Sequence, residues 1–329
     1  MNAPVPTSNF LDRFESRLRA SLTDPGHAER EPRVLLEASE HLAFAGAAKR
    51  MRPMLVDHFG AAVGLDGQVR LAVATAAELI HTASLLHDDV IDEGTERRGR
   101  PTANVQWDNS VAVLGGDLLL CIALEQLYDL PRPVTRTAVD LVAEMTRAAM
   151  LEVQARRERN WDLGEWETIA VGKTGSLLAW CGTASAIAAG RSELAERLAG
   201  CGRHLGLAFQ LTDDILDLVG EKTGKDRFAD LRNANPSFPV AFVRSHDGEL
   251  RAALDELWAT PTANDDDLDT MAAAIVDSGA PDETLRRVEA HLDEALSSLG
   301  EFADRPGGEH VAAWADQLRN IARHSLENS

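Results

Sequence analysis

The chain has 329 residues, and its 53 Asp and Glu against 33 Lys and Arg give it a formal net charge of -20. This charge repels nucleic-acid phosphates and anionic lipid headgroups, so neither is an expected partner, and any anionic substrate must be captured locally by basic groups or metal ions. Three separated cysteines, no apolar run of about 20 residues and no signal-peptide pattern over residues 1–9 argue against a disulfide framework, an integral membrane segment and secretion, and predict a cytoplasmic protein.

Helical patterns follow one another along almost the whole chain. Ala, Leu, Glu and Arg dominate, and the β-branched alternation of strands is missing. Residues 68–92 run without Gly or Pro as a long apolar helix, which belongs inside a bundle rather than on its surface. Further helices are predicted, with Gly or Pro between them, over residues 9–22, 107–129, 134–158, 165–188, 193–219, 247–258, 264–278, 282–299 and 309–325. Because nothing marks a domain boundary, the sequence predicts one all-α domain over residues 1–329.

Two acidic segments of the form DDxxD each end a long apolar helical pattern. Residues i and i+4 share one face of a helix, so the first and last Asp of each segment repel one another until a cation binds. Carboxylates without His or Cys suit Mg²⁺, which shares its shell with water and substrate phosphates. One DDxxD alone would more simply be a solvated helix end, but two copies indicate metal ions on both sides of one diphosphate. We call them the first aspartate patch and the second aspartate patch: Asp88, Asp89 and Asp92, and Asp213, Asp214 and Asp217.

Basic residues stand where a bound anion would need them. Guanidinium groups bind phosphate oxygens in pairs, and Lys adds a point charge. Either cluster alone would more simply be a helix cap or a solvated surface, but both flank the first aspartate patch in a strongly acidic chain. They are Lys49, Arg50 and Arg52 before it, and Arg97, Arg98 and Arg100 after it. Lys173 interrupts an apolar helix, where a lone ammonium needs a partner such as a buried phosphate.

In the order of these motifs, the chain resembles the trans-isoprenyl diphosphate (polyprenyl) synthases. The resemblance covers about residues 40 to 300. It rests on residues 46–53 (GAAKRMRP), 85–92 (LLHDDVID), 97–99 (RRG), 173–174 (KT), 209–217 (FQLTDDILD), 224–225 (GK) and 230–231 (DL). It implies an antiparallel helical bundle around a central cavity, usually a homodimer. The implied reaction joins isopentenyl diphosphate to an allylic diphosphate and gives a linear all-trans polyprenyl diphosphate.

The resemblance also implies a role for each matching residue. Asp88, Asp92, Asp213 and Asp217 would hold three Mg²⁺ ions, which Mn²⁺ could replace, with Asp89 and Asp214 supporting the site. Arg97, Lys173 and Lys225 would grip the allylic diphosphate, and Lys49, Arg52, His81 and Arg98 would bind isopentenyl diphosphate. The oxygens of Thr174 and Gln210 would face the allylic cation that forms once the leaving group's charge is neutralised. His81 has a simpler alternative, packing in the apolar core.

Two departures from the family pattern concern the diphosphate sites. Ala47 and Ala48 stand where the family usually has two glycines, whose freedom of φ lets the backbone approach a diphosphate. Asn235 follows Ala234 where the family often has Gly-Lys. We therefore expect a weak apparent affinity for isopentenyl diphosphate, improved by Asn235→Lys or by glycines at 47 and 48.

Two other protein classes share these features in part. A non-catalytic subunit that regulates another prenyltransferase would have lost carboxylates from one patch, and none is lost here. A terpene cyclase on a similar bundle generally replaces the second patch with an Asn/Ser/Glu pattern and needs no isopentenyl site. We therefore favour the synthase, with both classes kept as alternatives.

Product length depends on the residues that the growing tail meets. The tail should run down the helix that precedes the first patch, where Ser84 and Ala83 are small and would let it pass about one turn deeper. The simpler reading is that these small residues only let helices pack closely. We expect products of C20 or longer, with this line of wall and floor residues: Ser84, Ala83, Ile80, Ala77, Ala76, Met145, Met150 and Leu151.

Overall fold

The computed structural model describes residues 9–23, 29, 31–46, 48–159, 161–219, 228–260 and 264–327. Within these ranges it is a bundle of helices, and the only strands are β1 (Glu96–Arg97) and β2 (Arg100–Pro101). The two strands pair antiparallel in the loop after the first aspartate patch. The predicted all-α fold class is confirmed, and this two-residue hairpin is the one departure among the described residues.

The helices follow one another with short connections. In the first half they are α1 (Phe10–Thr23), α3 (Arg33–Ala43), α4 (Met51–Ala62), α5 (Gly67–Ile91), α6 (Ala103–Gln106), α7 (Asn109–Glu125) and α8 (Arg132–Glu158). In the second half they are α9 (Leu163–Ala170), α10 (Ser176–Ala188), α11 (Ala195–Val219), α12 (Ala229–Asn233), α13 (Phe238–His246), α14 (Gly248–Ala259), α15 (Asp265–Asp277), α16 (Ala280–Leu299) and α17 (Gly308–Glu327). A π turn, η1 (Val171–Gly175), joins α9 to α10, and 3-10 turns occupy Ser192–Leu194 and Gly300–Phe302.

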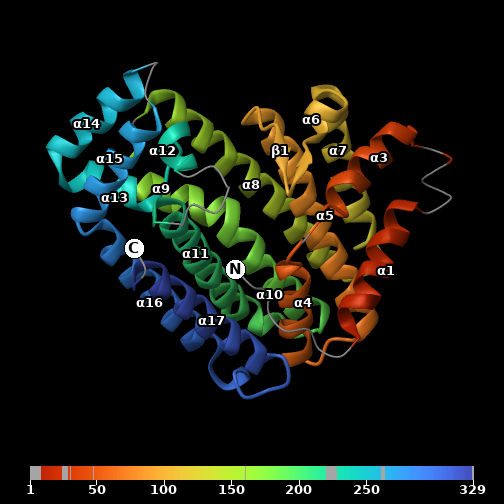
Figure 1. Ribbon diagram of the computed structural model, residues 1–329. Coiled ribbons are helices and arrows are strands. Elements are labelled where there is room, and N and C mark those ends of the chain that lie inside the picture. The colour runs from red at the N-terminus through yellow and green to blue at the C-terminus, as the bar shows by residue number, and fades with distance from the viewer. Residues whose placement is uncertain are drawn as a thin grey trace.

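The helices α10 and α11 lie in the middle of the bundle (Figure 1). α10 packs against α4, α5, α8 and α11, and α11 packs along α16 on its other side. Trp180 and Leu177 of α10 are buried, as are Leu205 and Leu211 of α11, so both helices are embedded in apolar surroundings. One continuous cluster of buried apolar side chains connects the N-terminal and C-terminal helices.

The helix α5 is long and apolar enough to cross a membrane, and it is the one such helix among the described residues. In the structure, 72% of its most apolar 18-residue window is buried against neighbouring helices. Asp66 caps its start by accepting hydrogen bonds from the backbone N–H groups of Gln68 and Val69. The burial identifies α5 as a core helix, which places the first aspartate patch where the core opens to solvent.

The helices α3, α4 and α13, and the short helices α6 and α12, were not predicted from the sequence. Pro239 was read as part of a stretch that breaks helices, but it lies in the first turn of α13, as Pro53 does in α4. A proline is tolerated in the first turn because the N–H groups there have no intrahelical acceptor. α3 likewise begins directly after Pro32.

Candidate active site

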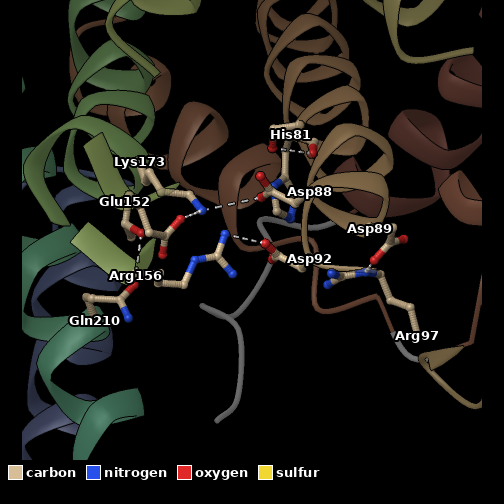
Figure 2. A network of polar contacts seen from close by, with 11 residues as sticks. His81, Asp88, Asp89, Asp92, Arg97, Glu152, Arg156, Lys173 and Gln210 are labelled. Atoms are coloured by element: carbon tan, nitrogen blue, oxygen red, sulfur yellow. Dashed lines mark hydrogen bonds and ion pairs between the residues drawn. The ribbon is translucent and has the colours of Figure 1, made fainter. Parts of the chain in front are cut away.

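The first aspartate patch lies at the C-terminal end of α5 (Figure 2). Asp88 and Asp89 belong to its last turn, and Asp92 is its C-cap residue. The negative end of the helix dipole adds to the repulsion among the three carboxylates, so nearby cations are needed. Burial raises the pKa of Asp88 and of Asp89, against the opposing effect of nearby basic groups.

Each carboxylate of this patch contacts a basic side chain. The three pairs are Lys173 Nζ with Asp88 Oδ2 at 3.6 Å, Arg97 Nε with Asp89 Oδ1 at 2.7 Å, and Arg156 Nη2 with Asp92 Oδ1 at 2.6 Å. The side chains come from four different elements of the bundle, and Figure 2 shows them converging on the end of α5. Arg97 and Lys173 were expected beside an allylic diphosphate, whereas Arg156 was not singled out from the sequence.

Lys173 lies on the π turn η1, which α8 approaches closely. A Cβ on Gly172 would stand 2.4 Å from the Cβ of Ala148, so only glycine fits at this contact. One turn further along α8, Glu152 accepts a hydrogen bond from Lys173 Nζ. Burial alone would lower the pKa of Lys173, but the carboxylates of Glu152 and Asp88 outweigh it and raise the pKa. The partner that a lone buried lysine needs is therefore supplied by carboxylates, and Glu152 is a site residue that sequence reasoning missed.

Thr174 and Gln210 meet where α11 crosses η1. A Cβ on Gly206 would stand 2.8 Å from the Cα of Gly175, so this glycine lets the two elements touch. One turn after Gly206, Gln210 Oε1 accepts a hydrogen bond from Thr174 Oγ1 at 3.0 Å. The Nε2 of Gln210 donates to Asp214 Oδ1 at 2.9 Å, which fixes the direction of its amide. The structure thus brings the two predicted oxygens together beside Lys173.

Asp214 of the second aspartate patch is buried, and its hydrogen-bond partners are neutral donors rather than cations. Its Oδ2 accepts from Trp166 Nε1 at 3.0 Å and from the backbone N–H of Phe238 at 2.8 Å. Burial raises the pKa of Asp214 to about 7, although these hydrogen bonds and that of Gln210 act to lower it. Both oxygens are therefore committed to the protein, which fits the predicted supporting role.

Asp217 holds the start of α12. Its two oxygens accept hydrogen bonds from the backbone N–H groups of Ala229 at 3.1 Å and Asp230 at 3.0 Å. Burial, then Asp214 and Asp217, raise the pKa of Asp230 well above its ordinary value. Asn235 Nδ2 donates to Asp230 Oδ1 at 3.2 Å, so the residue that replaces the family lysine stabilises this carboxylate. Asp230 was noted only as part of a motif, and Asp213 is half-buried on the same face of α11 as Asp217.

The predicted isopentenyl diphosphate residues are partly assembled. Arg52 and His81 line one cavity with Asp88 and Lys173. Burial, followed by the charges of Arg52, Arg98 and Arg97, lowers the pKa of His81 well below its ordinary value, so this ring is neutral. Lys49 and Arg98 are exposed at the surface, and Ala47 and Lys225 lie outside the described residues.

Arg50, the middle residue of the first basic cluster, has a structural role. Its guanidinium is buried and donates to Glu15 Oε1 and Glu78 Oε1, both at 2.6 Å, and to the carbonyl of Ala43 at 2.8 Å. These bonds tie α1 and α5 to the start of α4. Arg50 therefore orients the segment that carries Lys49 and Arg52.

A cavity of about 780 Å³ opens beside Asp88 and Lys173. It extends back along α5 and α8, because its lining includes residues two turns before Asp88 and residues up to three turns before Glu152. Its apolar lining comes from α5, α7 and α8: Ile80, Leu85, Ile91, Leu120, Val142, Met145, Ala149, Met150 and Val153. No residue of α11 is part of this lining, and neither is any described Phe, Tyr or Trp.

The residues predicted to shape the tail tunnel divide into two groups. Those that line the cavity are Ser84, Ile80, Met145 and Met150, and those that do not are Ala83, Ala77, Ala76 and Leu151. Ala83 is completely buried between helices. The side chain one turn before Asp88 on the cavity wall is therefore Ser84, and the expectation for Ala83 is wrong.

Comparison with known proteins gives consistent matches. Residues 32–275 match the family model described as Polyprenyl synthetase. The chain is 34% identical to the (2E,6E)-farnesyl diphosphate synthase of Mycobacterium tuberculosis, over 79% of this chain and 76% of that one. It is also 34% identical to the all-trans-nonaprenyl-diphosphate synthase of Rhodobacter capsulatus, over 81% and 82%. The fold is similar to that of a polyprenyl synthase from Caulobacter crescentus complexed with calcium and isoprenyl diphosphate, with a TM-score of 0.84, 27% identity and 95% of each chain covered.

Proposed function

Because this chain belongs to the polyprenyl synthetase family, we propose that it is a trans-prenyltransferase that condenses isopentenyl diphosphate with an allylic diphosphate. The observation that carries the proposal is one cavity whose mouth is lined by Asp88, Lys173 and Arg52 and whose walls are apolar. A charged diphosphate fits the mouth, and a hydrocarbon tail fits the walls.

We propose Mg²⁺ as the metal, three ions in all, with Mn²⁺ able to replace it. Among the described residues, no three His, Cys, Asp or Glu side chains converge on one point as a ready-made metal cage. Carboxylates in pairs, open to substrate phosphates, are the arrangement that Mg²⁺ uses. Asp88, Asp92, Asp213 and Asp217 would hold the ions, and the calcium bound with isoprenyl diphosphate in the Caulobacter crescentus relative supports a hard cation here.

The chain's own residues then have distinct tasks. Bound Mg²⁺ supplies positive charge that neutralises the leaving diphosphate. Lys173 and Arg97 bind the diphosphate of the allylic substrate, while Arg52 orients isopentenyl diphosphate beside it. The oxygen of Thr174, which lines the cavity, and that of Gln210, to which the Thr174 hydroxyl donates, would stabilise the allylic cation. The apolar walls exclude water, and the departed diphosphate takes the final proton, so no side-chain base is needed.

We propose products of C20 or longer. Ser84 is small, and no Phe, Tyr or Trp is part of the described cavity lining. Relatives that are 34% identical include both a farnesyl and a nonaprenyl diphosphate synthase, so overall identity does not decide the length. The wall residues decide it, and their composition favours a longer chain.

We also propose that the enzyme is a cytoplasmic homodimer. Large apolar side chains stand exposed on and just after α7 and on α8: Val113, Leu114, Tyr128, Val139, Met150 and Leu151. A second copy of the chain would cover this surface. Leu114→Glu should shift the sedimentation coefficient to that of a monomer, and an unchanged dimer in this variant would place the interface elsewhere.

The reaction is tested by incubating the enzyme with isopentenyl diphosphate, allylic diphosphates of C5 to C20 and Mg²⁺, with products identified by mass. Linear products that grow in C5 steps and disappear with EDTA are expected. Cyclised hydrocarbons formed without isopentenyl diphosphate would instead identify a terpene cyclase. No product except on addition of a second prenyltransferase chain would identify a regulatory subunit.

A further inference from the structure

The first aspartate patch is almost fully compensated by the protein's own cations. The four carboxylates at this end of the cavity are Asp88, Asp89, Asp92 and Glu152, and the basic side chains in contact with them are Lys173, Arg97 and Arg156. A divalent ion that binds Asp88 and Asp92 must therefore compete with an ammonium and a guanidinium. Lys173 keeps Glu152 as a partner when it is displaced from Asp88, whereas Arg156 needs a new partner once it is displaced from Asp92.

Arg156 is the arginine among these three cations that lines the cavity. It lies in the last turn of α8, and Figure 2 shows its guanidinium extending across the gap to Asp92 at the end of α5. Its side chain is only 17% exposed and lines the cavity, yet its one described ion pair is with Asp92. Its Nε is buried without a hydrogen-bond partner. An arginine with unused donors beside a diphosphate cavity is able to bind phosphate oxygens in a forked geometry.

We propose that Arg156 is an exchangeable counter-ion that pairs with Asp92 in the resting enzyme and transfers to the substrate diphosphate when the metal ions bind. This rests on the proposed function, and it makes Arg156 a positioning residue for metal and diphosphate. A metal ion alone would leave the Arg156 guanidinium half-buried and unpaired, which opposes binding. A diphosphate supplies oxygens for that guanidinium, so metal and diphosphate bind more tightly together than either does alone.

The proposal is tested by binding rather than turnover. Mn²⁺ affinity is measured by electron paramagnetic resonance of the free ion, alone and with inorganic pyrophosphate, for the wild type and for Arg156→Gln. The wild type should bind Mn²⁺ weakly alone and more tightly with pyrophosphate. In Arg156→Gln, Mn²⁺ alone should bind about three- to tenfold more tightly, because Asp92 has lost its competing cation. The enhancement by pyrophosphate should fall by at least the same factor, because Mn²⁺ alone already binds more tightly and glutamine has no charge to pair with the pyrophosphate.

Two variants serve as controls. Arg147→Gln removes the same charge from an exposed arginine of α8 that is not part of the cavity lining and has no ion pair with a described residue, and it should leave the coupling between Mn²⁺ and pyrophosphate unchanged. Arg156→Lys keeps the charge and should restore most of that coupling.

Equal Mn²⁺ affinity and equal coupling in the wild type and Arg156→Gln would overturn the proposal, as would identical effects of Arg156→Gln and Arg147→Gln. Failure of the proposed function is a different result, in which the wild type binds neither Mn²⁺ nor pyrophosphate and forms no product.

Discussion

The two aspartate patches have the same sequence pattern and opposite surroundings. Asp88, Asp89 and Asp92 contact the charged ends of Lys and Arg side chains at the mouth of the cavity. Asp214 and Asp217 instead accept hydrogen bonds from an indole, an amide and three backbone N–H groups. Long charged side chains exchange partners easily, whereas backbone donors are fixed by the fold.

The DDxxD motif can serve ligand binding and structural stability, and the two patches differ in how they combine these roles. In the first patch, the negative charge is kept available, and binding a ligand requires only that side chains rearrange. In the second patch, Asp214 and Asp217 join α11 to α9, α12 and α13, so their carboxylates also hold the architecture. We therefore expect substitutions in the first patch to affect mainly activity, and substitutions in the second to affect stability as well.

The largest expected effect is on turnover in the first patch. Asp88→Ala should lower kcat by at least about 100-fold, because it removes charge stabilisation needed chiefly in the transition state. The helical circular dichroism signal and thermal midpoint should stay close to those of the wild type. Asp140→Ala, an exposed aspartate on α8, is the control for loss of a negative charge. Near-normal turnover in Asp88→Ala would contradict the metal assignment.

The next effect is on stability in the second patch. Asp214→Ala should lower the free energy of unfolding by about 3 kcal/mol, because the buried donors of Trp166 and Phe238 lose their acceptor. Asp92→Ala, measured by the same urea titration, should cost less, since the Asp92 side chain is itself 39% exposed and its loss leaves no backbone or indole donor without an acceptor. Equal losses in the two variants would remove the contrast between the patches.

Product length should respond to a substitution beside the first patch on α5 but not to one beside the second patch on α11. Ser84 lies one turn before Asp88 on the cavity wall, and Phe209 lies one turn before Asp213 on α11, which contributes nothing to the described lining. Ser84→Phe should shorten the main product by at least one C5 unit, because the ring blocks the cavity beneath the first patch. Phe209→Ala should leave the length unchanged. A longer product in Phe209→Ala would mean that the tail runs along α11.

The smallest expected effect is on the pH dependence of stability, and it comes from a histidine pair outside both patches. The titration of this pair must be distinguished from that of the aspartates. His204 Nδ1 and His291 Nδ1 are 3.0 Å apart between α11 and α16. Burial, then His204 and Arg287, lowers the pKa of His291 to about 4 from 6.5. Because the unfolded chain takes up this proton first, the pair's contribution to stability is complete above pH 6.5 and is lost as the pH falls to about 4.

The free energy of unfolding falls as the pH is lowered, and His291→Gln should make this fall smaller by no more than about 1–2 kcal/mol, after allowing for solvent screening. Urea titrations at pH 7, 5.5 and 4.5 measure it, with the exposed His246→Gln as the control. A pH dependence identical to that of the wild type would show that the pKa of His291 is the same in the folded and the unfolded protein.

The helices that carry the two patches could be predicted from the sequence, but the contacts that other helices make with the patches could not. α5 and α11 have long apolar patterns, so their ends, and hence the aspartates, could be placed from periodicity. Glu152 and Arg156 could not be found this way, because α8 reads as an ordinary charged helix and their function depends on α5 and η1 packing beside it. Ala83 was predicted to line the tunnel together with Ser84 for a similar reason, since helical spacing alone does not say which face of α5 meets the cavity.

The π turn at Val171–Gly175 makes the chain one residue richer there than a regular α-helix would be. That surplus residue sets the rotational phase between α9 and α10. Trp166 before it faces Asp214, and Lys173 within it faces Glu152. Deleting one residue at this position would give a smoother helix and turn everything after it by about 100° relative to what precedes it. The π turn thus sets the rotation of α10 relative to α9. A regular α-helix here would not keep both the Trp166–Asp214 and the Lys173–Glu152 contacts.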